Sequence, residues 1–235
     1  MTAITKRELA SYFTTPLGYV FLAVFCGFSG LFLWLGCLRA GQSDMGVVFS
    51  MMFFILMIMI PVLTMRTMAD DKRQKTDQLT LTAPVSLFGI VAGKFLAAFA
   101  VFFFGMIVML IYAVFLSAAV ESFGWAVFWG NFLGMSLIGG VFISAGIFIS
   151  NLTENQMIAA IGSIGANIAI CMFDVISEYV PNETAKNILG ELSVYYKYSE
   201  FTIGIFSLKN VVFFMSIIVI FVFLTTRTTE RRRRS

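Results

Sequence analysis

The sequence contains no histidine, and it has few charged side chains. Histidine is the commonest general base and the commonest metal ligand, so its absence argues against most hydrolytic and metal-dependent chemistry. Only 12% of the residues are charged, whereas about 25% is usual in soluble domains. With 59% hydrophobic residues, 27 of them Phe, the composition indicates a protein that lies mainly in lipid. We expect no catalytic residue, bound cofactor or metal in this chain.

Cysteine is also scarce, which bears on disulfide and metal chemistry. Cys26, Cys37 and Cys171 lie in or beside apolar runs, and no two of them have C-x-x-C spacing. Cysteines in such surroundings are usually small buried hydrophobic residues, and we favour that interpretation. A disulfide or a metal site is the alternative.

What the sequence has in abundance is long apolar runs. A helix that spans a membrane needs about 20 mainly apolar residues, and six runs approach or exceed that length. We therefore predict an all-α integral membrane protein with one transmembrane domain over residues 1–235. The predicted spans are Leu17–Leu38, Met45–Met65, Ile90–Leu116, Trp125–Ile149, Met157–Ile176 and Leu208–Thr226.

The basic residues predict how these spans are oriented. Loops on the cytoplasmic side carry an excess of Lys and Arg. If both termini are cytoplasmic, twelve basic residues lie inside and four, namely Arg39, Lys186, Lys197 and Lys209, lie outside. We therefore expect a bacterial cytoplasmic membrane protein with both termini inside. The run Arg231–Arg234 is then an anchor near anionic lipid rather than a nucleic-acid site.

Two polar segments outside the spans carry helix signals. Residues 1–16 place Leu9 and Tyr12 on one side and Lys6 and Arg7 on another, which favours an interfacial helix on the cytoplasmic surface. A frayed terminus with basic anchors is the alternative. The segment 177–207 has mixed charges and four tyrosines. Since tyrosine favours membrane interfaces, we expect short helices there, resting on the outer surface.

The long polar stretch between the second and third spans is the leading functional candidate. Arg66–Arg73 can extend the second span, Thr76 can cap a short helix, and Ser86 can cap the third span. Connections between helices have a median of about 4–6 residues, so this stretch is unusually long. We predict a docking helix for a soluble partner; a solvated connection is the alternative. Its candidate coupling residues are Asp71, Lys72, Arg73, Thr76, Asp77, Leu79 and Leu81.

The spans themselves hold little chemistry. An ionisable residue within a membrane is a functional suspect by default, and only Asp174 comes close, near the outer end of the fifth span. Asn131 and Asn167, with Asp174, are candidates for lining a translocation path; we favour bonds between neighbouring helices for the two asparagines. Lys94 follows a glycine-rich stretch, but Phe95 replaces the Ser or Thr of a phosphate loop. We interpret Lys94 as a surface anchor.

Small residues recur at helical spacing in the fourth span. Gly130 and Gly134 form a G-x-x-x-G motif, and Gly140 and Ser144 are also four residues apart. Such residues allow close helix contact, which we favour. A flexible or cavity-lining helix is the alternative.

Three parts of the sequence together resemble a known family. They are the opening Lys6-Arg7-Glu8-Leu9, Tyr12-Phe13, Pro16 and Gly18-Tyr19; the central Pro61, Thr64-Met65-Arg66, Ala69-Asp70-Asp71-Lys72-Arg73, Thr76, Leu79, Leu81-Thr82, Pro84-Val85-Ser86 and Gly93-Lys94-Phe95-Leu96-Ala97; and the ending Leu224-Thr225 and Arg227. The chain resembles ABC-2 type permeases, and the nearest branch is the gliding-motility and copper-maturation type. Lys75 and Asp77 stand where many relatives have Gly and Glu, which makes the expected turn less sharp.

The resemblance implies a particular assembly. It implies six spans, an amphipathic helix before the first, and a cytoplasmic coupling helix between the second and third. It also implies a second permease copy, identical or not, above ATP-binding subunits that hold ATP and magnesium. On this basis we expect the permease of an exporter or lipid-extracting machine, with a candidate extracytoplasmic accessory partner. The alternatives are a membrane scaffold that transports nothing and an ion-coupled carrier.

Overall fold

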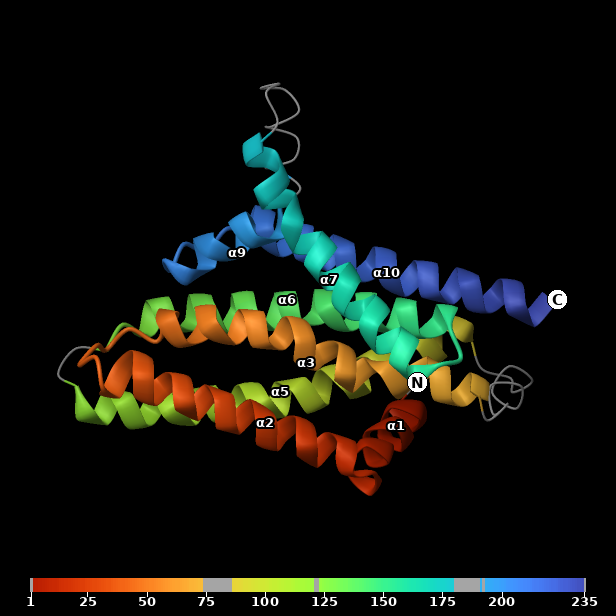
Figure 1. Ribbon diagram of the computed structural model, residues 1–235, viewed down its shortest axis with the longest axis horizontal. Coiled ribbons are helices and arrows are strands. Elements are labelled where there is room, and N and C mark those ends of the chain that lie inside the picture. Colours follow the sequence, from red (N-terminus) through yellow and green to blue (C-terminus); the bar gives the residue numbers. More distant parts are fainter. Residues whose placement is uncertain (1, 74–85, 121–122, 180–190, 192, 235) are drawn as a thin grey trace.

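The computed structural model describes residues 2–73, 86–120, 123–179, 191 and 193–234. Within these ranges all regular structure is helical, which confirms the predicted class, and six helices are long and apolar enough to cross a membrane. Figure 1 shows the helices gathered into an elongated bundle. They are α1 Thr2–Thr14, α2 Pro16–Leu33 with its π-helical continuation η1 Trp34–Leu38, α3 Gly46–Arg73, α5 Leu87–Ala119, α6 Trp125–Leu152, α7 Gln156–Tyr179, α9 Val194–Thr202 and α10 Leu208–Arg234.

The helix boundaries follow from local chemistry. Pro16 opens α2, where a missing N–H costs nothing, and Thr15 before it is extended. Ser86 caps α5 as predicted, since its hydroxyl accepts a hydrogen bond from the Gly89 N–H at 3.2 Å. Helix α3 passes through Pro61 and continues to Arg73. The polar extension of the second span is therefore confirmed.

The first helix is part of the bundle rather than a frayed end. Helix α1 packs against α5 and α2, and Tyr12 on its inner side is buried, whereas Lys6 and Arg7 are exposed. The elbow into α2 is tight, because a Cβ added at Gly18 would lie 2.6 Å from the Tyr12 carbonyl oxygen. The predicted helix is confirmed. Its position on the membrane surface stays a prediction.

Helix α6 is the central element, in contact with α3, α5, α7, α9 and α10. Its glycines allow the close approaches. A Cβ at Gly130 or Gly134 would lie 2.8 Å from Phe201 of α9, so the G-x-x-x-G motif seats this short helix. The other close glycines face different partners: Gly139 meets Phe102 of α5, Gly140 meets Ile218 of α10, and Gly146 meets Thr64 of α3. Close helix contact is therefore their role in this fold.

Helix α9 is embedded in the bundle along one side. Ser193 caps it by accepting from the Tyr196 N–H at 3.0 Å. Tyr198 is buried and stacks on Phe53 of α3 with ring centroids 5.0 Å apart, while Tyr196 is exposed. The sequence predicted a helix resting on the outer surface. The helix exists, but its inner side fills the bundle core.

Charged side chains anchor α9 to the start of α10. Lys197, which the count of basic residues assigns to a loop outside the membrane, is buried in the bundle, 3.4 Å from Glu191 and over the Phe213 ring. The long aliphatic stem of lysine makes such burial feasible while its charge meets a partner. Glu191 also accepts from Lys209 at 2.8 Å. The hydrogen bond from Lys209 and the charge of Lys197 lower the pKa of Glu191.

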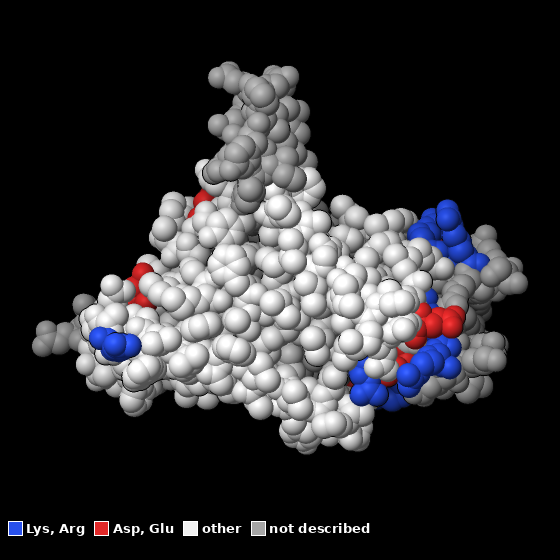
Figure 2. Space-filling view, viewed as in Figure 1, with Lys and Arg blue, Asp and Glu red and all other residues white. Residues whose placement is uncertain are grey.

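The charges of the described surface lie mainly at one end. Figure 2 shows blue and red side chains gathered at the right, beside the end of α3 and both termini, and a long uncharged middle. An uncharged middle between charged ends suits a molecule that crosses a membrane along the long axis of the view.

The hydroxyl of Tyr198 gives a first prediction. It is buried and has no hydrogen-bond partner within the described residues. Since an unsatisfied buried polar group costs about 1–3 kcal/mol, Tyr198→Phe should raise the thermal midpoint in detergent by about 2–4 °C. Tyr198→Ala, which also loses the stack on Phe53, should lower it. A lower midpoint for Tyr198→Phe would contradict the prediction and show that the hydroxyl is paired.

Candidate functional site

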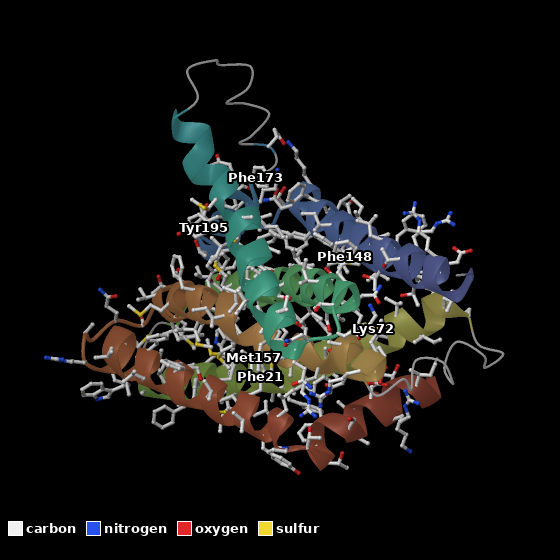
Figure 3. All side chains as sticks on the ribbon, turned by 45° about the vertical axis from the view of Figure 1, so that its right-hand side comes forward. Phe21, Lys72, Phe148, Met157, Phe173 and Tyr195 are labelled. Atoms are coloured by element: carbon white, nitrogen blue, oxygen red, sulfur yellow. The ribbon has the colours of Figure 1, made fainter. Side chains whose placement is uncertain are left out.

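Polar side chains from several helices converge on the last turns of α3. Those of α1, α3 and α5 border a cavity of about 240 Å³, which the start of α2 also lines. Figure 3 shows Lys72 of α3 at this end of the bundle. We call this set the polar cluster; its members are Glu8, Tyr12, Arg66, Thr67, Asp70, Asp71, Lys94 and Ser150.

Lys94 of α5 is the centre of the polar cluster. It is 2% exposed, so its interpretation as a surface anchor is wrong. Its ammonium group lies 2.7 Å from Asp71 and 3.3 Å from Glu8, and it donates to the Thr67 carbonyl at 2.7 Å. An ammonium has three N–H groups, so each finds an acceptor. Buried charge is tolerated under these conditions, and the result is one junction between α1, α3 and α5.

Tyr12 forms a second link between α1 and α3. Its hydroxyl lies 3.1 Å from the Thr67 hydroxyl and donates to the Leu63 carbonyl at 3.4 Å. Burial raises the pKa of Tyr12 to about 12, so the phenol keeps its proton at neutral pH. Beside it, Arg66 donates to Asp70 at 2.8 Å, one helical turn apart. Helix α1 is therefore fixed to α3 by hydrogen bonds, while it packs against α5 and α2.

Ser150 of α6 makes a third link by entering the hydrogen-bond ladder of α3. Its hydroxyl donates to the Met65 carbonyl at 3.0 Å and accepts from the N–H groups of Met68 and Ala69 at 3.2 and 3.1 Å. In a regular α-helix the Ala69 N–H bonds directly to the Met65 carbonyl. The Ser150 hydroxyl bridges these two groups, and a side chain at the backbone ladder is a known cause of helix bending.

The same end of α3 also reaches α7 and α10. Lys72 donates to the Asn151 carbonyl of α6, and Gln156 of α7 donates to Asp70. The Asn151 amide donates in turn to α10, at 3.2 Å to the Thr225 carbonyl and 2.6 Å to the Thr228 hydroxyl. A displacement of the end of α3 thus acts on α1, α5, α6 and α7 directly, and on α10 through Asn151.

The structure describes three of the seven predicted coupling residues. Asp71 belongs to the polar cluster, Lys72 bonds to α6, and Arg73 is the exposed last residue of α3. Their role in coupling stays a prediction. Thr76, Asp77, Leu79 and Leu81, together with the predicted coupling helix, lie outside the described residues.

The two asparagines proposed for a translocation path bond to different helices. The buried Asn131 amide donates to the Thr202 carbonyl of α9 at 3.2 Å. The buried Asn167 amide donates to the Met57 carbonyl of α3 at 3.3 Å. These contacts are the helix–helix bonds favoured from the sequence, and a role in a path stays a prediction. Asp174 lies in α7, but its side chain is outside the described part.

Sequence reasoning missed Glu8, Lys94, Ser150 and Asn151 as members or neighbours of the site. Lys94 carried a usable signal, since it lies inside the apolar run that became α5. A charge inside a span is expected to have a partner, and acidic residues were available at Glu8 and Asp71. No comparable signal marked Ser150, because serines that only bond their own helix are common, as Ser163 does here.

Comparison with protein families decides the identity. A family model described as ABC-2 family transporter protein matches residues 4–234. The chain belongs to the ABC-2 transporter family. No curated protein matches this sequence. The ABC-2 resemblance inferred from the motifs is therefore confirmed, whereas its gliding-motility and copper-maturation branch stays a prediction.

Membership fixes the coarse function. With its six candidate spans, this ABC-2 protein is a multi-pass membrane subunit of a transporter, a permease rather than a catalytic subunit. Membership also implies an ATP-binding partner subunit and dimerisation.

Lys94 provides a test of the polar cluster. Lys94→Met removes the cation and leaves Glu8 and Asp71 without their shared partner, so we expect the free energy of unfolding to fall by about 3 kcal/mol. Adding Asp71→Asn to Lys94→Met should recover part of that loss. Thermal unfolding in detergent measures both changes.

Arg7→Met is the matched control for Lys94→Met. It removes the other cation bonded to Glu8, but Arg7 is exposed, and exposed ion pairs contribute at most about 1 kcal/mol. Equal losses for Lys94→Met and Arg7→Met would show that Lys94 is not the centre of the cluster.

Proposed function

We propose that this ABC-2 permease is moved by a separate ATP-binding subunit that grips the segment 66–86 and that it works as an exporter or lipid-extracting machine. ATP and magnesium are held by that subunit, and this chain supplies no catalytic group. Two permease copies, identical or different, enclose the path for the substrate. A tyrosine-rich outer segment offers a surface for an extracytoplasmic accessory protein.

The observation that carries this proposal is the bonding of the end of α3. The segment 66–86 begins on α3 at Arg66, within the polar cluster. Lys94, Tyr12 and Ser150 join that part of α3 to three other helices. A rigid-body push on the segment is therefore passed to most of the bundle at once, which is what an ATP-driven permease requires.

The distribution of basic residues supports a cytoplasmic location for the end of α3. Arg66, Lys72 and Arg73 at the end of α3, Lys94 in α5 and Arg227 in α10 belong to the end that carries the larger share of Lys and Arg. Since the side of a membrane protein that is richer in Lys and Arg faces the cytoplasm, both termini are cytoplasmic. The polar cluster then lies where a soluble ATP-binding subunit can reach it.

Two leucines of the segment test the coupling. Buried apolar side chains at the centre of an interface contribute about 2 kcal/mol or more each. Leu79→Asp with Leu81→Asp should therefore detach the ATP-binding subunit, or leave its ATP hydrolysis insensitive to the permease, while the protein still inserts. Co-purification and ATPase assays of the reconstituted complex measure this.

The matched control places the same two charges in the connection between η1 and α3. Gln42→Asp with Ser43→Asp adds them in a loop on the opposite side of the membrane in the predicted topology. This variant should keep the ATP-binding subunit. Full assembly and normal ATPase behaviour of the Leu79/Leu81 variant would refute the proposed coupling.

Single cysteines test the orientation. Gln42, between η1 and α3, and Glu154, between α6 and α7, occupy exposed positions and are each replaced by cysteine. In a background without the native cysteines, an impermeant maleimide added to intact cells should label position 42 and spare position 154. The reverse pattern, or labelling of both, would contradict the proposed topology.

A further inference from the structure

Helix α3 has a gap in its backbone hydrogen bonding at Pro61. Proline has no N–H, so it cannot donate to the carbonyl of Met57 one turn earlier. In the hydrocarbon region no water replaces the missing donor, and a free carbonyl there is costly. Yet α3 continues as a helix through this point to Arg73. The Met57 carbonyl therefore needs a donor from elsewhere.

Asn167 of α7 supplies that donor. Its amide nitrogen donates to the Met57 carbonyl at 3.3 Å, from a residue 110 positions away in the chain. The side chain is fully buried, and its amide oxygen has no partner within the described residues. A buried amide with an unpaired oxygen is costly, and a leucine would avoid this cost. The contact with Met57 is therefore what favours an asparagine here.

Further polar contacts loosen α3 on the side of Pro61 that leads to the polar cluster. The Thr64 hydroxyl bonds back to the Ile60 carbonyl at 3.1 Å, an arrangement that often bends helices. Thr64 also lies directly against Gly146 of α6, where no side chain intervenes. One turn later the Ser150 hydroxyl bonds to both the Met65 carbonyl and the Ala69 N–H. The segment between Met57 and Ala69 thus depends on α6 and α7 for part of its backbone bonding.

We propose that Pro61 is a joint in α3 and that Asn167 is a positioning residue that holds this joint in the state described here. The joint divides α3 into an outer half, which packs on α9 through Phe53 and Tyr198, and an inner half, which ends in the polar cluster. When the inner half is displaced, α3 bends at Pro61 and the hydrogen bond from Asn167 to the Met57 carbonyl breaks.

This inference rests on the proposed function for the cause of the displacement, but the hydrogen bond stands on its own geometry. Figure 1 shows α7 crossing the bundle beside α3, and these two helices are in contact. Since Asn167 bonds to the outer side of the joint and Gln156 of the same helix bonds to Asp70 on the inner side, α7 spans the joint. It is therefore placed to sense bending.

A double-mutant cycle tests the hydrogen bond without any transport assay. Pro61→Ala restores an N–H that can donate to the Met57 carbonyl within α3. In the parent, Asn167→Leu should lower the thermal midpoint in detergent by at least about 2–4 °C. In the Pro61→Ala background the same change should lower it by less than half as much, because the carbonyl no longer needs Asn167.

Ser163→Ala is the matched control for this cycle. Ser163 is buried in the same helix, and its hydroxyl donates to the Ala159 carbonyl of α7 itself. Its loss should lower the midpoint equally in the parent and in the Pro61→Ala background. Equal costs of Asn167→Leu in the two backgrounds would overturn the role of Asn167 at the joint.

Spin-label distances test the bending. In the complex with the ATP-binding subunit and without native cysteines, labels at the exposed residues Met51 and Arg73 report the length of α3 across Pro61. A non-hydrolysable ATP analogue should change this distance in the parent, and Pro61→Ala should abolish the change. A second pair at Ala10 of α1 and Glu154, both exposed, reports whether the polar-cluster end moves at all.

The two pairs separate the two claims. A change at Ala10–Glu154 with none at Met51–Arg73 would overturn the joint and leave the proposed coupling standing. No change at either pair would contradict the proposed coupling and, with it, the use of the joint. A change at Met51–Arg73 that persists unaltered in Pro61→Ala would show that α3 bends elsewhere, which also overturns the joint.

Discussion

A carbonyl in the hydrocarbon core of a membrane has no water to bond to, so every interruption of a spanning helix must be repaired by the protein itself. In α3 the carbonyl left without a donor by Pro61 is bonded by Asn167 of α7. Nearer the polar cluster, Ser150 of α6 bonds to the Met65 carbonyl and the Ala69 N–H. The conformation of the second span therefore depends on how α6 and α7 are placed.

The polar cluster also depends on partners from other helices, but here the groups that need partners are charged side chains. Lys94 is buried near the charged end of the bundle, and its three donors require acceptors from α1 and α3. Separating these helices would take the buried cation away from both of its carboxylate partners, at a cost of several kcal/mol. The helices at this end are consequently bound into one unit, whereas the middle of α3 is held by single neutral hydrogen bonds. A stiff end joined to a softer middle is a suitable arrangement for passing on a mechanical push.

Much of the fold could be predicted because membrane spans are a matter of length and composition. The six apolar runs, the Ser86 cap and the extension through Arg66–Arg73 all follow from local sequence. The polar cluster could not be predicted in the same way, because it depends on Glu8 meeting Lys94, 86 positions further along the chain. The burial of Lys197 could not be predicted for a related reason: its long stem lets the ammonium group enter the bundle, and this depends on where Phe213 and Glu191 lie in the fold.

The glycines of α6 have a consequence for how this permease can change over time or by design. The close approaches along the helix are divided among four neighbours: α9 at Gly130 and Gly134, α5 at Gly139, α10 at Gly140 and α3 at Gly146. One added methyl group therefore presses on one chosen neighbour. The glycines of α6 thus set the distance to each neighbouring helix separately. Substituting one of them can shift one neighbour without changing the charged residues at the end of the bundle.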